Sequence, residues 1–303
     1  MTTPLGTVGM PEAVASASNA TPSGRTAKTK KARMPKAARD TQLGMARWAR
    51  RLLTAGVFFF VLAGWQATVS LFDVSPLIFP TPGSVIASLV SGVISGEIPQ
   101  HLMVTLVEIL AGFVIGSALG FFLGALIGQS AVMEAVIYPY VVAFQTMPKV
   151  AVAPLFVIWF GFGIASKVVI TATIVFFPVV VNTIVGLRSV PRDQVDLMTA
   201  CMASRWQAFR MVRLPHALPF VFAGLDIGIV LAVIGAIVGE FVGSQAGLGY
   251  MILQRNFSMD TSGVFAILIV LSLIGIGLHA IVHRISRRMI FWTETSADLS
   301  RAS

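Results

Sequence analysis

The stretch RSVPRDQVDLMTACMASRWQAFRMVRLPHALP, residues 188–219, is a polar and basic interval between two strongly hydrophobic segments. It begins as a turn and then predicts two short amphipathic helices that end in Leu-Pro. Asp193 follows a proline at the first helix start, and Ser204 can cap the second helix, which carries Trp206 and Phe209 near one face. A plain connection between membrane helices need not be this long or this ordered. The interval therefore predicts an element that fits a partner's groove.

Composition identifies the chain as an integral membrane protein before any motif is considered. Of its 303 residues, 56% are hydrophobic and 12% are charged, and the mean hydropathy is +0.84. The net charge of +9 does not indicate nucleic-acid binding, because the basic residues flank hydrophobic segments, as they do in bilayer proteins. We therefore expect an all-α membrane protein with about six transmembrane helices, at 52–72, 104–128, 132–160, 167–187, 219–242 and 264–282.

Two of the expected spans have unusual residues. The third contains Pro139, Pro148 and Pro154, each without an amide donor, which predicts a broken or kinked helix that lines protein or water rather than lipid. The second has glycine at every fourth position, which leaves a smooth groove where another helix can approach closely. Simple intrachain contact and helix sliding both fit this pattern. The glycines expected in the helix contact are Gly112, Gly116, Gly120 and Gly124.

Basic residues are concentrated on one side of a six-span arrangement. The N-terminal tail, the polar interval and the C-terminal tail hold 19 of the 22 Lys and Arg residues, whereas the loop at 73–101 holds none. The positive-inside rule therefore places both termini and the interval in the cytoplasm. Composition also predicts a disordered basic tail at 1–45, a transmembrane domain at 46–290 and a second tail at 291–303. The lone Cys201 excludes an intrachain disulfide.

The polar interval resembles the cytoplasmic coupling loop of ATP-binding-cassette importer permeases. That loop reads Glu-Ala-Ala, three residues, Gly, nine residues, Ile, one residue, Leu-Pro; here Asp196 replaces Glu, Met202 replaces Gly, and the alanine pair is absent. The spacing and the Leu-Pro end match. Over roughly residues 76–290 the chain is similar to nitrate, sulfonate and taurine permeases, at Pro148-Lys149 through Pro154-Leu155, Trp159-Phe160-Gly161, Ser166-Lys167, Ala203-Ser204-Arg205-Trp206-Gln207, Gly239-Glu240 and Gly247-Leu248-Gly249-Tyr250.

The resemblance implies a type I importer fold, with a five-helix core and one preceding helix, in the inner membrane of a bacterium. Such a permease forms the pathway for a small solute, as a pair of permease subunits with two cytoplasmic ATPase subunits and an extracytoplasmic binding protein. We expect the pair to be a homodimer, with a paralogue as the alternative second subunit. The chain lacks a Walker A motif, so we expect the partner ATPase to use the ATP and Mg²⁺, and this chain to be no enzyme and to bind no cofactor or metal.

The interval at about 188–217 is then the ATPase-coupling loop. The alternative is a helix that lies on the lipid surface, with Trp206 and the arginines among the headgroups. The residues expected to couple to the ATPase are Asp196, Leu197, Ala200, Ala203, Ser204, Arg205, Trp206 and Phe209.

Charged side chains at membrane depth are the candidates for the pathway. Lys149, in the broken span, faces the pathway with Gln145 or snorkels to an interface. Glu240 ends the fifth span, where the resemblance places an acid that holds the outer gate or accepts hydrogen bonds from loop amides. Glu108 and Asp226 stand where many relatives carry arginine, and structural pairing or interfacial placement is expected for both.

Other functions fit the sequence less well. His279 and His283 have metal-compatible spacing but no third ligand nearby, so we expect them at the headgroups. A secondary transporter or channel is the alternative function, but it would need coupling-ion sites and often an inverted repeat, and we find no convincing repeat. A membrane enzyme is disfavoured because no Ser-His-Asp set or metal constellation is present.

Overall fold

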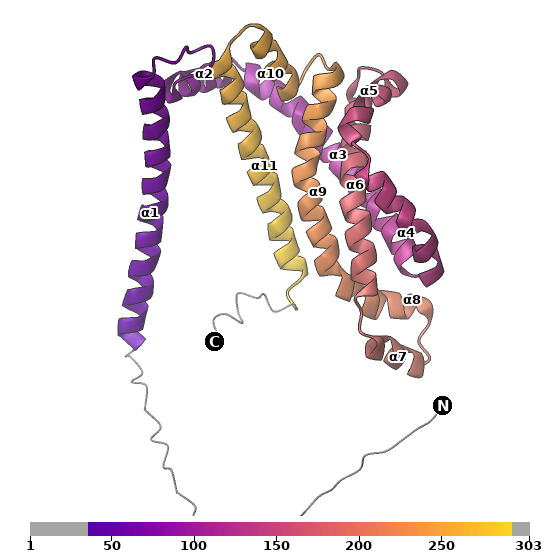
Figure 1. Ribbon diagram of the computed structural model, residues 1–303. Helices are drawn as coiled ribbons and strands as arrows, with labels where there is room; N and C mark the ends of the chain where they lie inside the picture. Colours follow the sequence, from indigo (N-terminus) through magenta and orange to yellow (C-terminus); the bar gives the residue numbers. More distant parts are fainter. Residues whose placement is uncertain (1–35, 293–303) are drawn as a thin grey trace, which may run out of the picture. The chain divides into compact units, whose positions relative to one another are not determined.

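The computed structural model describes residues 36–292, and none of these lies in a strand. The chain divides into two compact units, Met1–Phe58 and Phe59–Ser303. The elements drawn in Figure 1 are α1 (Lys36–Leu71), α2 (Pro82–Ile94), α3 (Glu97–Gly128), α4 (Ala131–Thr146), α5 (Lys149–Phe160), α6 (Ile164–Arg188), α7 (Arg192–Ala200), α8 (Arg205–Ala208), the π-helix η1 (Phe209–Arg213), α9 (Leu214–Gly243), α10 (Leu248–Phe257) and α11 (Thr261–Met289).

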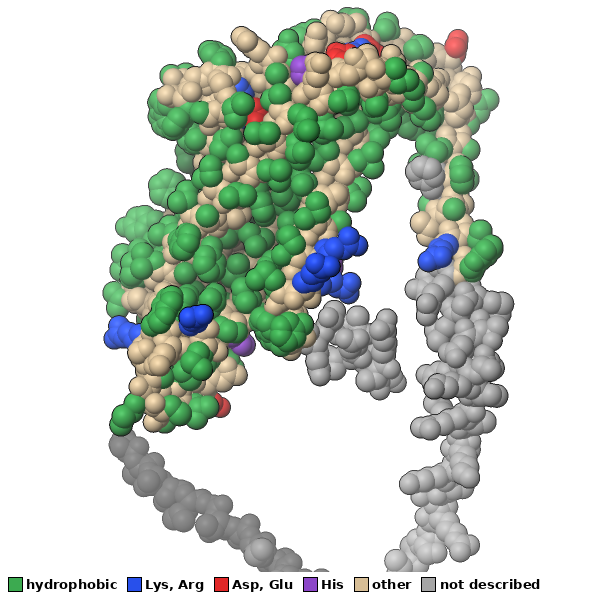
Figure 2. Space-filling view, turned by 180° about the vertical axis from the view of Figure 1, so that it is seen from behind, with side chains coloured by type: hydrophobic (Ala, Val, Ile, Leu, Met, Phe, Trp, Pro, Cys, Tyr) green, Lys and Arg blue, Asp and Glu red, His purple; other side chains and the backbone are tan. Residues whose placement is uncertain are grey.

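Five stretches of the described chain are long and apolar enough to cross a bilayer, namely Arg51–Leu71, Glu97–Gly128, Ile164–Arg188, Arg205–Gly243 and Thr261–Met289. The pair α4 and α5 supplies a sixth span if it is counted as one. Figure 2 shows hydrophobic side chains over the sides of the long helices, and Phe122 of α3, 70% exposed, is one that faces lipid in a bilayer. The predicted all-α membrane class, with about six spans, is confirmed.

The third span is broken as predicted, and the break lies at the middle proline. Helices α4 and α5 meet at 91°. Pro148 pushes the preceding Met147 out of helical geometry, and Met147 has φ −63° and ψ 132°. Pro139 and Pro154 lie inside α4 and α5 without ending them. One proline therefore makes the bend, and the other two leave only local gaps in the hydrogen bonding.

The centre of the bundle is formed by α3, α6 and α9, which lie side by side (Figure 1). The row of glycines on α3 faces α6. A Cβ atom added at Gly120 would lie 2.8 Å from the carbonyl oxygen of Phe176 and 3.0 Å from Cβ of Val179, so the two backbones are in direct contact. The other predicted glycines have neighbours on the same helix, and they are Gly112, Gly116 and Gly124.

The start of α1 differs from the prediction of a disordered tail over 1–45. The helix begins at Lys36, so the predicted boundary falls inside it. The reason is that residues 36–51 are rich in Ala and Arg, which favour helix, and continue directly into the apolar span. Most of both predicted tails, residues 1–35 and 293–303, lies outside the described residues.

The polar interval also differs from prediction at its end. Two helices were expected to stop at Leu-Pro, but α8 continues through η1 into α9 without a break. In an α-helix the ring of Pro215 would clash with the carbonyl group of Met211, four residues earlier. In the wider turn of η1 the amide of Leu214 donates to the carbonyl oxygen of Phe209, five residues back, and the chain stays helical.

The contact between α3 and α6 leads to a testable prediction. Gly120→Ala should destabilise the detergent-solubilised protein by about 1–3 kcal/mol, because the added methyl group meets backbone that cannot move aside. Gly275→Ala in α11 is the matched control, since no atom lies within 4 Å of an added Cβ there. Thermal unfolding followed by size-exclusion retention measures both. An equal loss of Tm in the two variants would contradict the close contact.

Candidate functional site

Helices α7 and α8 lie at one end of the bundle, beyond the ends of α6 and α9 (Figure 1), and the segment from α7 to η1 exposes four large apolar side chains. We call this group the apolar patch, and it consists of Leu197 (63% exposed), Met202 (94%), Trp206 (65%) and Met211 (66%). A loop that served only as a connection would have no reason to expose four such groups together. On the opposite face of α7, Val195 and Met198 are half-buried toward the membrane helices.

The patch stands on a rigid base. Oγ of Ser204 accepts the amide hydrogen of Gln207 at 3.2 Å, and Oε1 of Gln207 accepts the amide hydrogen of Ser204 at 2.8 Å, which is a complete capping box. The ring of Trp206 stacks on that of Phe209 with centroids 5.6 Å apart. Phe209 is only 8% exposed, in a cluster with Ala125, Leu187 and Ala217.

This placement corrects one prediction and locates the others. Phe209 was expected at the partner surface, but it is buried because it lies where η1 passes the end of α3. Its ring stacks on that of Trp206. Ala203 is half-buried. The remaining predicted coupling residues are exposed, and they are Asp196, Leu197, Ala200, Ser204, Arg205 and Trp206.

Met202 occupies the position of the glycine in the coupling-loop pattern, and its backbone shows why glycine suits that place. Its φ angle is +54°, in the left-handed region that glycine adopts freely and that costs other residues about 1 kcal/mol. The turn between α7 and α8 thus keeps the glycine conformation without the glycine. In exchange it presents a fully exposed thioether side chain.

The two predicted pathway residues on the broken span lie at its bend. Nζ of Lys149 donates to the backbone carbonyl oxygen of Gln145 at 2.8 Å and lies 4.8 Å from the ring centre of Phe177. Gln145 itself is exposed, and Lys149 is half-buried. The ammonium group therefore caps the end of α4 while part of its surface stays accessible.

A buried polar cluster lies at the opposite end of α9, and Lys167 is at its centre. This lysine is 1% exposed. Its Nζ donates to the carbonyl oxygens of Gly163 at 3.0 Å and Gly243 at 2.6 Å, and also to that of Phe162. These carbonyls belong to the turn between α5 and α6 and to the last residue of α9. The ammonium group thus joins three helix ends.

Two buried carboxyl groups complete the cluster. Glu240 accepts hydrogen bonds from Oγ1 of Thr105 at 2.6 Å and from the backbone amides of Gly249 and Tyr250 at the start of α10. Glu108 is also 1% exposed and shares a hydrogen bond with Glu240. Two carboxylates cannot bond to each other unless one holds a proton. Glu240 already accepts from three donors, so we expect a proton between the two carboxyl groups to lie on Glu108.

Gly247 is required next to this cluster. Its φ angle is +111°, and an added Cβ atom would collide with the carboxyl group of Glu240. Its amide donates to Nδ1 of His101 on α3 at 2.9 Å. Of the two roles left open for Glu240, the geometry supports hydrogen bonding to loop amides, since the side chain is enclosed and faces no open passage.

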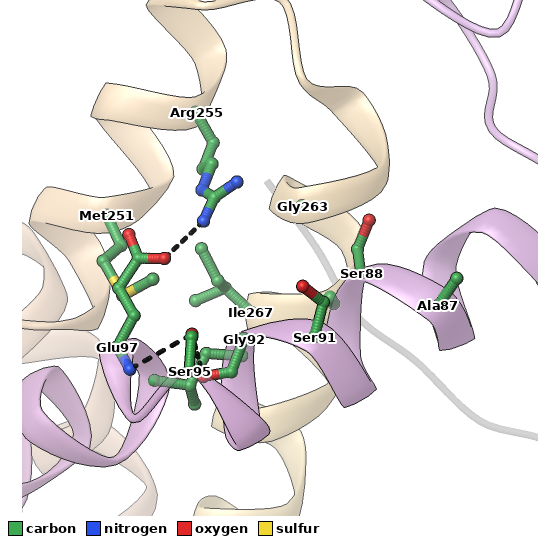
Figure 3. A pocket seen from close by; sticks show the side chains of 12 residues that line it. Ala87, Ser88, Ser91, Gly92, Ser95, Glu97, Met251, Arg255, Gly263 and Ile267 are labelled. Atoms are coloured by element: carbon green, nitrogen blue, oxygen red, sulfur yellow. Dashed lines mark hydrogen bonds and ion pairs between the residues drawn. The ribbon is translucent and has the colours of Figure 1, made fainter.

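Three further acidic groups lie beside basic side chains. Oδ1 of Asp226 lies 2.9 Å from Nδ1 of His279, so α9 and α11 hold this acid through a histidine that was expected at the headgroups. Glu97 and Asp260 both pair with Arg255, at 2.6 and 2.8 Å. Figure 3 shows Arg255 bonded to Glu97 in the lining of a cavity of about 300 Å³ between α2, α10 and α11. Because Arg255 already pairs with two carboxylates, the cavity offers no unpaired cation to an anionic ligand.

Sequence reasoning missed Thr105 as a partner of Glu240, and it missed Lys167 as a buried charge at the same end of α9. A signal was present, because Lys167 stood at the edge of a predicted span while Glu108 and Glu240 lay in other spans, and charges at membrane depth are expected to pair. What spacing could not supply was which helices are neighbours.

The protonation of Glu108 can be tested by a pair of substitutions. Glu108→Gln should leave thermal stability nearly unchanged, because an amide reproduces the donor that faces Glu240. Glu240→Gln should cost about 1–3 kcal/mol, because its amide group cannot accept the hydrogen bonds that the carboxylate accepts. Unfolding of both variants in the same detergent is the measurement. The assignment is refuted if Glu108→Gln proves the more damaging change.

The backbone of Met202 supports a second prediction. Met202→Gly should slow limited proteolysis between α7 and α8, because it removes about 1 kcal/mol of left-handed strain. Met202→Val should speed it, since a β-branched residue is least tolerated at this φ angle. Cleavage rates of the three proteins, compared with a remote cleavage site as internal standard, decide the matter. Identical rates would show that the turn is not strained.

Comparison with known proteins places the geometry in a family. Residues 116–291 match the family model described as binding-protein-dependent transport system inner membrane component. The chain is 32% identical to a putative aliphatic sulfonates transport permease protein of Bacillus subtilis, over 81% of this chain and 88% of that protein. It is 37% identical to a riboflavin transport system permease protein of Chloroflexus aurantiacus and 36% identical to a formylaminopyrimidine transport permease protein of Halalkalibacterium halodurans, each over 53% of this chain. The last two matches span only 60% and 64% of those relatives.

A solved structure agrees in fold. The inward-facing MetNI methionine ABC transporter superposes with a TM-score of 0.55 at 20% identity, over 62% of this chain and 93% of that chain. That likeness supports the type I importer fold. Together with the family match over more than half of its length, it shows that the chain belongs to the binding-protein-dependent transport system inner membrane components.

Proposed function

We propose that this chain is the permease subunit of an ATP-driven importer, which moves a small solute received from an extracytoplasmic binding protein. The apolar patch is the observation on which the proposal depends. Its side chains are exposed, the start of α8 is fixed by a capping box, and Trp206 stacks on the buried Phe209. The family assignment supports the proposal. This assignment does not support the alternative function, a secondary transporter or channel.

In this proposal the apolar patch binds an ATPase subunit, and the whole importer has two permease and two ATPase subunits. Trp206 and Met202 are the anchors, because large exposed apolar groups dominate such interfaces. Asp196 lies at the polar rim. The ATPase, not this chain, binds ATP and Mg²⁺. The basic ends of the chain then lie in the cytoplasm, on the same side as the patch.

The solute pathway lies along the bent α4–α5 face in this proposal. Large apolar side chains stay exposed there, including Phe144, Trp159 and Phe160, so a second copy of the chain has a surface to cover. Gln145 and Lys149 supply polar groups at the bend. The relatives are named for aliphatic sulfonates, riboflavin, formylaminopyrimidine and taurine, which supports a small organic solute of the sulfonate, taurine or pyrimidine-like class.

The proposal is tested by truncating the exposed anchor. Trp206→Ala should reduce co-purification of the ATPase with the permease by at least tenfold, because loss of a buried interfacial aromatic group costs about 2 kcal/mol or more. The membrane level of the permease should stay normal, since Trp206 is exposed in the chain alone. Pull-down from membranes, with immunoblots of both subunits, gives the two readings.

The matched control is Trp159→Ala, another tryptophan that is 66% exposed and lies on α5, away from the patch. It should leave ATPase attachment intact. Unchanged attachment and transport in Trp206→Ala would instead favour a helix on the lipid surface, and the proposed coupling site would be lost.

A further inference from the structure

The inner side of α7 and α8 borders a groove that the coupling role does not use. Its volume is about 590 Å³, and it separates α7 and α8 from the turn between α3 and α4. One wall is apolar and the other polar. The lining residues are Leu126, Gln129, Ser130, Met133, Val195, Met198, Thr199, Ala203, Arg205, Ala208, Phe209 and Arg213.

The groove is electropositive. Arg205 and Arg213 line it, no acidic residue of the described chain does, and neither arginine has an ion-pair partner among the described residues. Asp196 shares a smaller adjoining cavity with Arg213 but forms no ion pair with it. The start of α4 also opens here, at Ser130 and Met133, and a helix N-terminus adds positive potential to the two guanidinium groups.

The location is the level of the headgroups. The apolar run of α3 ends at Gly128 and that of α4 begins at Ala131, so Gln129 and Ser130 lie where the spans leave the hydrocarbon. From Leu126 an exposed apolar strip continues along α3 into the membrane. Its members lie on one helical face at intervals of three and four residues, and they are Leu119 (57% exposed), Phe122 (70%) and Leu126 (53%).

We propose that this groove binds the phosphate headgroup of an anionic phospholipid, with an acyl chain along Leu119, Phe122 and Leu126. The two arginines bind the phosphate oxygens, Gln129 can donate to the headgroup, and the apolar strip accepts the chain. A phosphate group alone would use only the polar wall. The continuity of the strip with the groove is what points to a lipid.

A lipid in this groove would also support the position of α8. Phe209, the residue that supports Trp206, forms part of the groove wall. A bound lipid would therefore fill the space behind α8 and hold its distance from the end of α3. This inference depends on the membrane position of α3 and α4 and not on attachment of an ATPase.

The test is lipid retention by the full-length chain. The purified protein is exchanged into nanodiscs of phosphatidylcholine with phosphatidylglycerol, released into detergent and analysed by native mass spectrometry. One phosphatidylglycerol per chain should be retained. Arg205→Gln and Arg213→Gln should each weaken retention about fivefold, since a basic residue near anionic lipid contributes about that factor. Arg213→Lys, which keeps the charge, should retain most of the lipid.

Arg210→Gln is the matched control, because Arg210 is exposed in the same helical segment but does not line the groove. It should retain lipid like the unaltered chain.

Equal retention in all variants would overturn the proposal. Displacement of the bound lipid by millimolar inorganic phosphate would assign the groove to a soluble anion. Crosslinking of two copies through Leu126→Cys, in a Cys201→Ala background, would show that a second permease, and not a lipid, covers the groove. ATPase co-purification, measured alongside, separates failure here from failure of the proposed function.

Discussion

A charged group inside a bilayer must find its hydrogen-bond partners within the protein, and the cluster around Lys167 satisfies this requirement at the ends of helices. The lysine binds backbone carbonyl groups of the turn after α5 and of the end of α9, and Glu240 binds backbone amides at the start of α10. Glu240 therefore meets a helix N-terminus, and Lys167 meets the C-terminus of α9. Glu108 lies beside Glu240 and is as deeply buried, so the two carboxyl groups share one enclosed site.

This constraint also fixes the architecture at that end of the bundle. Partners of the cluster come from α3, α6, α9 and α10, and from the turn that follows α5. Moving any one of these elements would leave a charge or a backbone group unpaired in hydrocarbon, which costs several kcal/mol. The middle of the bundle needs no such ties, because contact along the glycine row of α3 holds it to α6. The α7–α8 end is different again, since it is held by a capping box and one buried phenylalanine.

Local chemistry in the sequence predicted much of this structure. Hydropathy gave the class and the spans, the prolines gave a broken third span, and Ser204 followed by Gln207 gave a capped helix. What failed depends on neighbours in space. Nothing near Pro148 in sequence shows that it, and not Pro139, makes the bend. Periodicity placed Phe209 and Trp206 near one face, but only the end of α3 decides which ring is covered. The partners of Lys167 lie up to 76 residues away.

The unbroken path from α8 through η1 into α9 has a consequence for how the two ends communicate. Helix α9 has 30 residues and is therefore about 45 Å long; Trp206 lies in α8, which leads into it through η1, and Glu240 lies in its last turn. A rod of that length, tilted by about 5° at one end, shifts its far end by roughly 4 Å, which is more than a hydrogen bond can stretch. One stiff helix therefore joins the α7–α8 loop at one end to the hydrogen bonds of Glu240 at the other. A tilt of α9 that starts at the α8 end is thus large enough, by geometry, to disturb the hydrogen bonds of Glu240 at the other end.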